Sequence, residues 1–505
     1  MTGVVIATSL GLLDPSLLVR VEDPNHPDAL ATTATHAVLA EPPTDGTPWR
    51  YEAIGYPDGE LDDSGTPTIA VEVSNADLWH ADGITGKGVR VAVFDTGWFA
   101  PEHDIGLLGD FQSADCWNAP GCEQPIDVLR PRLNFEDGAH GLSCAEIVRD
   151  IAPDAELFLV RTNTLAAVQN AVEWSIRNDI DVITMSMSFF NDSFYDGGRG
   201  PWDDLMHRVE AHDILFVTSS GNNARAHWSG SWLDVDADNH LDFDGSNGLA
   251  VDLPAGSSSF FINWNQHGRC GDTDLSARVV GPEGTVHGLV NEPQLASDPT
   301  HCQPFERLNV KTDEEGIYTL KVRQRRGRTV DLKVDILGRS GALMVNTQRE
   351  RSLGDPAAHP LAFAVGAVRA SDYLTANPES FSSRGPNHAG WPKPDIAGPD
   401  GLSTASAGPL SFYGTSGSSP AVAGMIALIL QDNPDLTPRE AARKLQGWAW
   451  QMDPEWDDPR WGAGKARLPV RDVRSWGCME AQGLAGVWLL PLCWLRRRRT
   501  GPRLR

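Results

Sequence analysis

The sequence predicts an α/β fold, a parallel sheet with helices on both faces, interrupted by an all-β, sandwich-like insertion. Three observations predict it. Between residues 76 and 224 short apolar runs alternate with helical patterns, as in a parallel sheet that is covered on both sides. From about residue 225 these helical patterns give way to short alternating strands with turn-rich links. After residue 350 an apolar strand and a long apolar helix return.

The first part of the α/β domain is expected to contain four strands and three helices. Each predicted strand is a short apolar run, and each helix shows apolar residues at helical spacing. In chain order we expect a strand at 89–94, a helix at 145–151, a strand at 157–160, a helix at 165–177, a strand at 182–187, a helix at 202–211 and a strand at 214–218. The second part contributes a strand at 361–368 and a helix at 421–430.

These elements divide the chain into five segments. Residues 1–70 are rich in Pro, Asp, Thr and Gly and are expected to form a leader, a propeptide-like extension with little periodic structure. Residues 71–224 and 350–472 form the two parts of the α/β domain, and 225–349 form the insertion. Residues 473–505 form a tail that is apolar and then rich in arginine.

The formal net charge of −26 limits the partners of the folded protein. Nucleic acid and anionic membrane surfaces would both be repelled by such an acidic molecule. Acidity of this size keeps a protein soluble but does not identify a substrate; the expectation of a monomer whose partner is a protein or peptide rests on the motifs described below.

Cysteine usage favours an oxidising compartment. Of the seven cysteines, Cys116 and Cys122 enclose the short loop CWNAPGC, and Cys270 and Cys302 could bridge in another region. Neither pair has the clustered spacing of a zinc site. Buried free thiols are the alternative, because sequence does not fix the connectivity.

The two ends of the chain differ in what they predict about export. The first residues are apolar but lack a basic start and are interrupted by Asp14, so they make a poor signal peptide. The tail combines Gly477-Cys478, the apolar run 483–495 and four arginines. As a helix this run would be about 20 Å long, too short to span a hydrocarbon core of about 30 Å comfortably. The tail resembles the sorting segments of some exported bacterial proteins, with transient membrane association; a nonspecific hydrophobic tail is the alternative.

The stretch GTSGSSPAVAGMIALIL places hydroxyl residues before an apolar helix. Pro420 suits the first turn of a helix, and 421–430 is apolar all round, as in a helix at the centre of a domain. A helix N-terminus offers free N–H groups, so Ser416 beside it could act as a nucleophile whose product oxyanion is stabilised. The alternative is that Ser416, Ser418 and Ser419 only cap the helix.

Three other residues would complete a hydrolytic site with Ser416. Asp95 and Asn222 each follow a predicted strand, where sites form in parallel sheets, and His140 precedes a helical pattern. Taken singly each has an ordinary structural explanation, as a turn, cap or packed residue. In the order Asp95, His140, Asn222, Ser416 they supply an orienting carboxylate, a general base, an oxyanion donor and a nucleophile.

These residues stand in motifs that resemble those of subtilisin-like serine proteases (subtilases, peptidase family S8). The motifs are VRVAVFDTG (89–97), HGLSCAEIVRDIAPDAEL from residue 140, VTSSGNN (217–223), and FSSRGP, KPDIAGP and GTSGSSPAVAG in the region of the serine. The resemblance covers roughly 76–224 and 355–470 and implies a three-layer fold. It also implies that Asp95 orients His140, that His140 serves as base and then acid, that Asn222 donates to the oxyanion, and that Ser416 attacks.

The substrate-binding strand departs from the family pattern. In TMSMSFF, the residues Ser186, Met187 and Ser188 match the strand that pairs with extended substrate and walls the first specificity pocket. Ser188 and Phe189 stand where the family usually has glycines, so their side chains are expected to narrow that pocket. Near the triad, Ser143 and Cys144 also replace the usual residues after the catalytic histidine.

An acidic loop in the insertion predicts a calcium site. In DVDADNHLDFDG, Asp234, Asp236 and Asp238 alternate with other residues and offer the oxygen ligands that a hard cation prefers. The loop is not an EF-hand, and a solvated acidic turn is the alternative. No cofactor is expected for the chemistry itself; calcium would be structural.

The sequence thus predicts an exported serine endopeptidase of the bacterial cell surface or the extracellular space. One alternative is a catalytically silent protein of the same fold that binds a partner at the surface. Another is an adhesion module whose protease domain is vestigial. The complete set of Asp95, His140, Asn222 and Ser416 favours the enzyme.

Overall fold

The computed structural model describes most of the chain from residue 69 onward. The described residues are 69–98, 105–117, 121–126, 138–190, 200–266, 272–292, 304–407, 411–451 and 460–471, with six short strands between residues 19 and 62. The predicted tail and the pair Cys270 and Cys302 lie outside these residues. Within them, no helix combines the length and the apolar character needed to cross a membrane.

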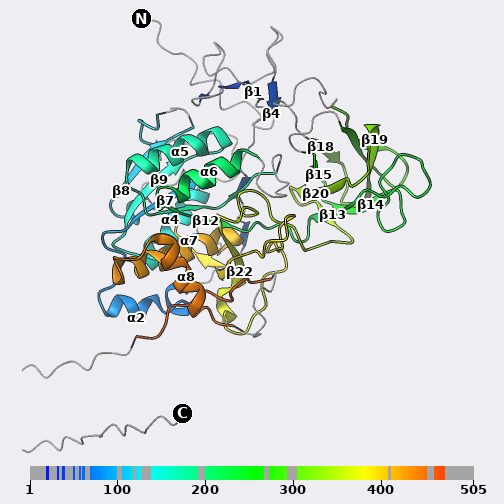
Figure 1. Ribbon diagram of the computed structural model, residues 1–505. Coiled ribbons are helices and arrows are strands. Elements are labelled where there is room, and N and C mark those ends of the chain that lie inside the picture. Colours follow the sequence, from blue (N-terminus) through cyan, green and yellow to red (C-terminus); the bar gives the residue numbers. More distant parts are fainter. Residues whose placement is uncertain are drawn as a thin grey trace, which may run out of the picture. The chain divides into compact units, whose positions relative to one another are not determined.

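A seven-stranded parallel sheet forms the centre of the α/β part (Figure 1). Its strand order is β23-β22-β12-β10-β7-β9-β8, and all neighbouring strands run parallel. The strands are β7 (Arg90–Asp95), β8 (Phe111–Asp115), β9 (Glu156–Arg161), β10 (Val182–Met185), β12 (Leu215–Ser219), β22 (Phe363–Arg369) and β23 (Ile396–Asp400).

Helices cover both faces of this sheet, which confirms the predicted fold class. Along β7, Val91 and Val93 belong to one core, while Ala92 and Phe94 belong to the other, because successive side chains of a strand point to opposite faces. The first core includes residues of α1 (Ala70–Val73), α2 (Ala76–Ala81), α4 (His140–Ile151), α7 (Thr415–Asp432) and α8 (Pro438–Trp448). The second includes residues of α5 (Leu165–Arg177) and α6 (Pro201–Glu210).

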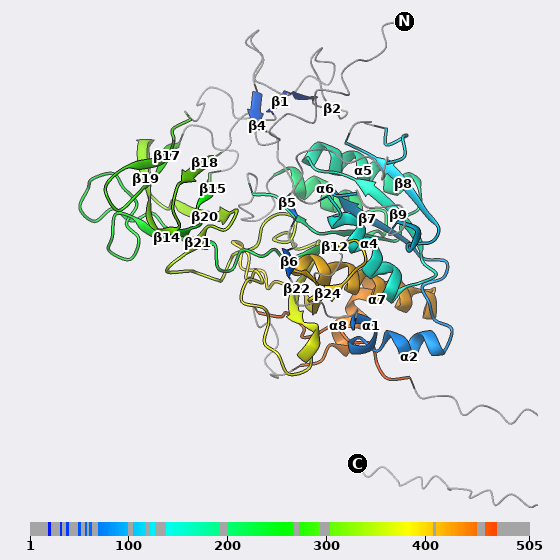
Figure 2. The same ribbon diagram turned by 180° about the vertical axis from the view of Figure 1, so that it is seen from behind.

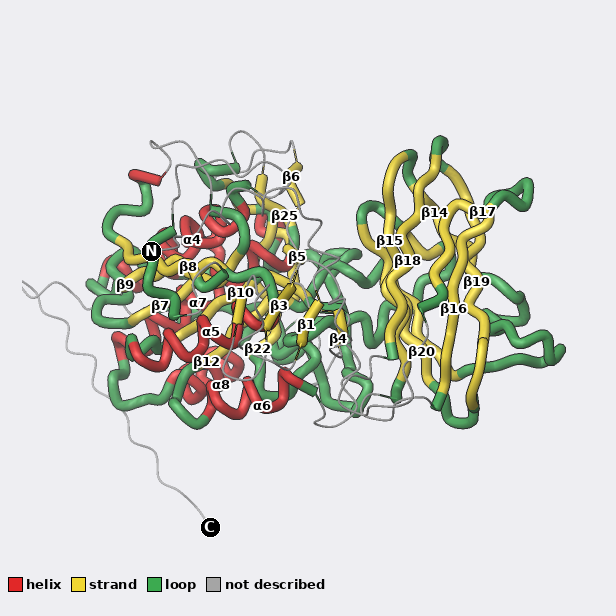
Figure 3. Tube along the Cα trace, turned by 90° about the horizontal axis from the view of Figure 1, so that it is seen from above, coloured by secondary structure: helices red, strands yellow, loops and turns green. Residues whose placement is uncertain are grey.

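Between the two parts of the α/β domain, the chain forms two antiparallel sheets that face each other (Figure 3). One has the order β13-β20-β15-β18 and the other β17-β16-β19-β14-β21, and a continuous apolar core lies between them. The strands are β13 (His227–Ser231), β14 (Leu249–Leu253), β15 (Gly256–Trp264), β16 (Thr273–Val280), β17 (Val286–Val290), β18 (Phe305–Thr312), β19 (Gly316–Gly327), β20 (Lys333–Arg339) and β21 (Leu343–Met344). These strands form the sandwich.

The sandwich contacts the α/β part through an aromatic cluster. Phe190, just after the predicted substrate-binding residues, packs with Phe261, Phe305 and Leu337 of the sandwich, and all four side chains are buried. The guanidinium of Arg339 lies 5.5 Å from the centre of the Phe190 ring. The sandwich therefore supports the chain directly beyond Ser188.

A buried polar cluster makes a second contact between the two parts. Asp335 Oδ1 of the sandwich lies 2.7 Å from His227 Nε2 and 3.4 Å from Nε2 of His388, which belongs to the α/β part. Burial alone would raise the pKa of Asp335, but the neighbouring imidazoles of His227 and His388 outweigh it and hold that pKa below its usual range. Asp335 is therefore ionised at neutral pH.

The leader contains more regular structure than the sequence predicts. Four strands, β1 (Val19–Val21), β2 (Ala31–Thr32), β3 (Ala37–Leu39) and β4 (Trp49–Tyr51), form an antiparallel sheet of order β2-β3-β1-β4. Each is two or three residues long, so no alternation of apolar and polar residues is visible in the sequence.

Two further leader strands pair with the α/β part (Figure 2). β5 (Tyr56–Pro57) lies antiparallel to β11 (Met187–Ser188). β6 (Glu60–Asp62) lies antiparallel to β25 (Ser411–Tyr413), which in turn pairs with β24 (Leu402–Ser403).

The described cysteines include one disulfide bond and one free thiol. Cys116 and Cys122 are joined, with an S–S distance of 2.06 Å, as their short loop predicts. Cys144 on α4 is a buried free thiol.

Candidate active site

The four predicted catalytic residues lie at one edge of the parallel sheet. β7 ends at Asp95, and Asn222 comes shortly after the end of β12. His140 is the first residue of α4, and Ser416 is in the first turn of α7. Because parallel strands all end at the same edge, residues far apart in the sequence meet there.

A chain of hydrogen bonds links the carboxylate, the imidazole and the hydroxyl. Asp95 Oδ2 lies 2.8 Å from His140 Nδ1, and His140 Nε2 lies 3.0 Å from Ser416 Oγ. The exposed fractions of Asp95, His140 and Ser416 are 0%, 6% and 0%. Away from water, the polar partners of this chain are limited to one another and to the surrounding backbone.

The backbone fixes the carboxylate and the imidazole in place. Asp95 Oδ1 accepts hydrogen bonds from the N–H groups of Thr96 at 2.8 Å and Gly97 at 3.0 Å, so its other oxygen faces His140. The edge of the imidazole contacts Phe412, with ring centres 5.0 Å apart. Gly141 has no room for a side chain, since a Cβ there would stand 2.7 Å from both Asp95 Cβ and Gly97 O. The sequence His-Gly therefore lets α4 start directly against Asp95.

The helix that carries Ser416 begins earlier than predicted. α7 starts at Thr415, so Pro420 lies inside it and not in its first turn. A proline inside a helix leaves the carbonyl four residues earlier without its N–H partner, and here that carbonyl belongs to Ser416. Its oxygen instead accepts from Ser186 Oγ at 3.1 Å and from Cys144 Sγ at 3.6 Å. These tertiary contacts allow the helix to extend past Pro420 to the serine.

The other hydroxyls of this stretch do not cap the helix. The N-cap residue is Gly414, and it makes no side-chain capping bond. Ser418 Oγ donates to the carbonyls of Gly398 and Pro399, at 3.2 and 3.1 Å, and Ser419 Oγ lies 3.0 Å from Thr184 Oγ1. Both hydroxyls therefore tie the helix to neighbouring strands, and only Ser416 faces the imidazole.

Asn222 is held by the residue that precedes the nucleophile. Its Oδ1 accepts from the backbone N–H of Thr415 at 3.1 Å and from Thr415 Oγ1 at 3.0 Å. Because the oxygen end of the carboxamide is engaged in this way, its NH₂ end is the donor end. The side chain is half-buried, unlike the triad.

The predicted substrate-binding residues take different places. Met187 and Ser188 form β11 and pair with a leader strand, as a strand that binds extended peptides would. Ser186 faces the nucleophile, and Ser416 Oγ also lies 3.4 Å from its carbonyl oxygen. Ser188 is buried beside Gly221, where a Cβ would lie 3.3 Å from Ser188 Oγ.

The thiol next to the site is inert as a nucleophile. Burial raises the pKa of Cys144 well above its usual value, and the negative charge of Asp95 raises it further. A protonated thiol is a weak nucleophile, so the hydroxyl of Ser416 stays the candidate nucleophile of this cluster.

In the acidic loop of the sandwich, the structure groups a set of carboxylates that differs by one residue from the predicted set. One oxygen from each of Asp234, Asp236 and Asp242 lies within 4.8 Å of the others. Asp238 instead accepts from Asn247 Nδ2 at 2.7 Å and faces His240 at 3.1 Å. Oxygen ligands fit calcium, so the predicted site stays a prediction, with Asp242 in place of Asp238.

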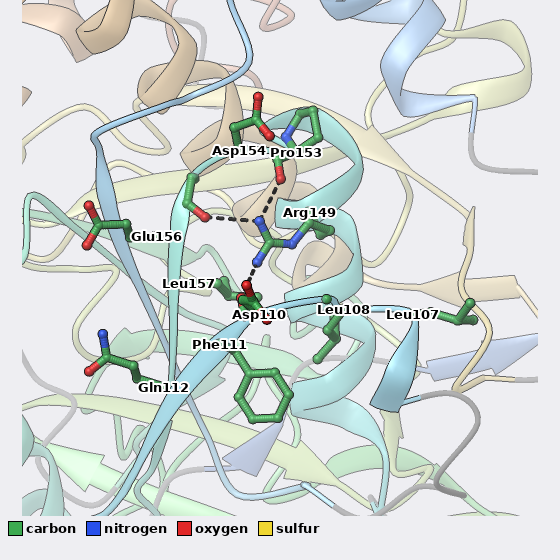
Figure 4. Close-up of a pocket in the computed structure, with 12 residues that line it drawn as sticks. Leu107, Leu108, Asp110, Phe111, Gln112, Arg149, Pro153, Asp154, Glu156 and Leu157 are labelled. Carbon is green, nitrogen blue, oxygen red and sulfur yellow. Dashed lines mark hydrogen bonds between the residues drawn. The ribbon is translucent and has the colours of Figure 1, made fainter.

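A cavity of about 520 Å³ lies at the opposite edge of the sheet (Figure 4). Glu156, which lines it, begins β9 and pairs with Arg90 at the start of β7, whereas Asp95 ends β7. Arg149 projects into this region and donates to the carbonyls of Pro153, Ala155 and Asp110 at 2.7 to 3.0 Å. The guanidinium thus braces the end of α4, far from the triad.

Sequence reasoning missed Thr415 and Asp400. Thr415 binds Asn222, and Asp400 Oδ1 accepts from the N–H of Gly414 at 2.7 Å. Asp400 carries the same signal that singled out Asp95, an aspartate at the end of a buried strand. Thr415 carries no signal of its own apart from its place before the serine.

Comparison with known proteins gives consistent results. The model of the subtilase family matches residues 86–264 and 336–459. The minor extracellular protease Epr of Bacillus subtilis is 25% identical over 160 residues, which are 29% of this chain and 21% of that protein. Subtilisin DY of Bacillus licheniformis is 25% identical over 169 residues, 31% of this chain and 56% of that protein. The matched parts thus span less than two thirds of these relatives.

A solved structure extends the likeness to the fold. The CspB protease of Clostridium perfringens aligns with a TM-score of 0.53 and 18% identity, covering 79% of this chain and 96% of that one. This alignment bears on the fold alone. Since the family model covers more than half of the 505 residues and the fold agrees, the chain belongs to the subtilase family.

Proposed function

We propose that the chain is an exported serine endopeptidase that cleaves proteins or peptides through an acyl-enzyme. The observation that carries the proposal is the hydrogen-bond chain from Asp95 through His140 to Ser416, with distances of 2.8 and 3.0 Å. This is the geometry that a hydroxyl nucleophile needs for activation by a general base.

In the first half of the reaction, Ser416 attacks the peptide carbonyl. His140 Nε2 takes the proton of Ser416 Oγ as the new C–O bond forms, and Asp95 stabilises the resulting imidazolium. The carbonyl oxygen becomes an oxyanion, which accepts hydrogen bonds from the Ser416 backbone N–H and from Asn222 Nδ2. His140 then gives its proton to the leaving amine, and an acyl-enzyme remains.

In the second half, water replaces the amine. His140 takes a proton from the water as it attacks the ester, a second oxyanion forms and collapses, and the proton returns to Ser416 Oγ. No metal or organic cofactor takes part in either half.

The proposed substrates are extended peptides, because two segments of the leader already pair with the α/β part as extended strands. β5 pairs with β11, and β6 pairs with β25, which ends just before Gly414 and Ser416. The two strand pairings flank the nucleophile. Strand pairing binds a peptide through its backbone hydrogen bonds, whatever most of its side chains are.

Two observations support export. The disulfide bond between Cys116 and Cys122 suits an oxidising compartment. One relative is named as an extracellular protease. We place the chain at the bacterial cell surface or outside the cell, as a monomer.

The test is labelling of the purified chain with a fluorophosphonate probe, which reacts with activated serines. We expect labelling of the wild type, before or after proteolytic removal of the leader, and none of Ser416→Ala or of heat-denatured protein. If the wild type stayed unlabelled in both forms, the chain would be a catalytically silent binding protein of this fold.

A further inference from the structure

The backbone that leads into the nucleophile is held by two side chains. The chain leaves β25 at Tyr413, turns at Gly414 with φ of 112° and enters α7 at Thr415. The first N–H groups of a helix have no partner within the helix. Here the N–H of Thr415 donates to Asn222, and that of Gly414 donates to Asp400 Oδ1 at 2.7 Å.

Asp400 is placed for this contact by the sheet. It is the last residue of β23, the edge strand of the parallel sheet, and its exposed fraction is 0%. Its other oxygen, Oδ2, has no hydrogen-bond partner among the residues that the structure describes. A buried carboxyl group with one oxygen unpaired costs stability. The backbone N–H of Gly401 also acts on this carboxyl group, while the hydrogen bond from Gly414, at 2.7 Å, is the one that joins it to the turn before α7.

Burial works against ionisation of this carboxyl group. Burial raises the pKa of Asp400 well above its usual value, and the negative charge of Glu379 raises it further. Hydrogen bonds from the backbone N–H groups of Gly401 and Gly414 and the positive charge of Arg369 lower that pKa, but by less. Arg369 is itself bonded to Glu379 at 3.1 Å.

We propose that Asp400 is a positioning residue for the nucleophile: its Oδ1 fixes the Gly414 amide and thereby the backbone that sets Ser416 against His140. This inference rests on the proposed function. Glycine has more backbone freedom than any other residue, so without an acceptor the turn at Gly414 would sample other conformations. A displacement of the reacting group by about 1 Å costs a rate factor of about 10².

The test compares Asp400→Ala, which removes the acceptor, with Asp400→Asn, which keeps an oxygen in its place. For each full-length chain, kcat and KM are measured on a chromogenic peptide, together with the rate of fluorophosphonate labelling and the Tm. We expect Asp400→Ala to lower kcat and the labelling rate by about 10- to 100-fold. KM should change little, because Asp400 is not in the substrate-binding strands. Asp400→Asn should recover most of the lost rate.

Other outcomes separate the two claims. If the wild type reacts and Asp400→Ala reacts equally fast, whatever its Tm, the inference is wrong and the proposed function stands. If Asp400→Asn is as slow as Asp400→Ala, the acceptor oxygen is not what matters, and the inference is wrong again. A wild type that does not react overturns the proposed function as well. Should Asp400→Ala fail to fold, Asp400→Ser, whose hydroxyl is too short to reach Gly414, takes its place.

Discussion

The α/β part and the sandwich bury polar residues in different ways. In the parallel sheet all strands end at one edge, so Asp95, Ser186, Asn222 and Asp400 gather there beside the starts of two helices. In the antiparallel sheets of the sandwich, neighbouring strands run in opposite directions, so their carboxyl ends do not share one edge.

The buried carboxyl groups show the same difference. Asp95 has three partners, the imidazole of His140 and two backbone N–H groups. Glu306 in the sandwich accepts from the N–H of Glu292, and burial raises its pKa to about 9. The carboxyl ends of the parallel strands are where the candidate site lies. Five predictions, from the largest effect to the smallest, test this comparison.

The first prediction compares the loss of a serine hydroxyl in the α/β part with the same loss in the sandwich. We expect Ser416→Ala to lower peptide hydrolysis by about 10⁴-fold or more, the scale of losing a triad nucleophile, with an unchanged Tm. Ser258→Ala removes a buried hydroxyl that donates to Ser340 O, and it should leave hydrolysis unchanged. Equal rates in wild type and Ser416→Ala would refute the assignment.

The second prediction concerns the junction of the two parts. Phe261→Ala removes a ring from the cluster around Phe190, and loss of a buried Phe side chain costs about 3–5 kcal/mol of unfolding free energy. The matched control is Ile317→Ala on the sandwich surface, where the side chain is 52% exposed. Denaturant unfolding of both variants checks this, and equal loss in the two would contradict a buried junction.

The third prediction addresses the oxyanion donor. Asn222→Ala should lower kcat by about 10²–10³-fold with little change in KM, because the bond to the oxyanion is made only after attack. The same change at Asn265, whose Nδ2 donates to Asp331 O in the sandwich, serves as the control. A fall in affinity with kcat preserved would assign Asn222 to substrate binding.

The fourth prediction is a pH dependence in the sandwich. Burial raises the pKa of Glu306 to about 9, against about 4.3 in an unfolded chain. In the folded state Glu306 therefore stays protonated to a higher pH than in the unfolded chain. The contribution of Glu306 to the free energy of unfolding is full below pH 4 and is lost as the pH rises towards 9. Glu306→Gln has no such loss.

The Tm of Glu306→Gln should therefore exceed that of the wild type by a margin that grows from pH 5 to pH 9. The exposed Glu283 supplies the control, since Glu283→Gln should show no such trend. A margin that stays constant with pH would mean that Glu306 titrates normally.

The smallest expected effect is that of calcium. If the acidic loop binds it, removal by EDTA should lower the Tm by a few degrees, and calcium should restore it, because a ligand that binds only the folded state stabilises it. Asp236→Asn should abolish the response. An identical Tm with and without EDTA would show that the loop is only a solvated turn.

Much of the fold was predictable because its signals are local. The strand predicted at 89–94 is β7, the helix at 165–177 is α5, and the change of pattern after residue 224 marks the start of the sandwich. Each of these predictions depends on a short stretch of sequence whose apolar residues show the spacing of a strand or a helix. The fold class and the family follow from these runs and from the motifs at their ends.

The features that sequence missed all depend on partners distant in the chain. α7 extends back to Thr415 because Ser186 and Cys144 donate hydrogen bonds to the Ser416 carbonyl. Neither residue is near Ser416 in the sequence. β5 and β6 are too short for a periodic signal and exist through their pairing with β11 and β25. Such contacts become visible only when the strands are placed side by side.

Because of Pro420, the place of Ser416 in the first turn of α7 depends on tertiary contacts. In a free peptide only water would donate a hydrogen bond to the Ser416 carbonyl. A helix that extended back across Pro420 would gain no backbone hydrogen bond from the proline. The two donors to that carbonyl, Ser186 just after β10 and Cys144 on α4, reach it only in the folded protein. The place of Ser416 at the start of a helix is therefore a product of tertiary folding and not of the local sequence.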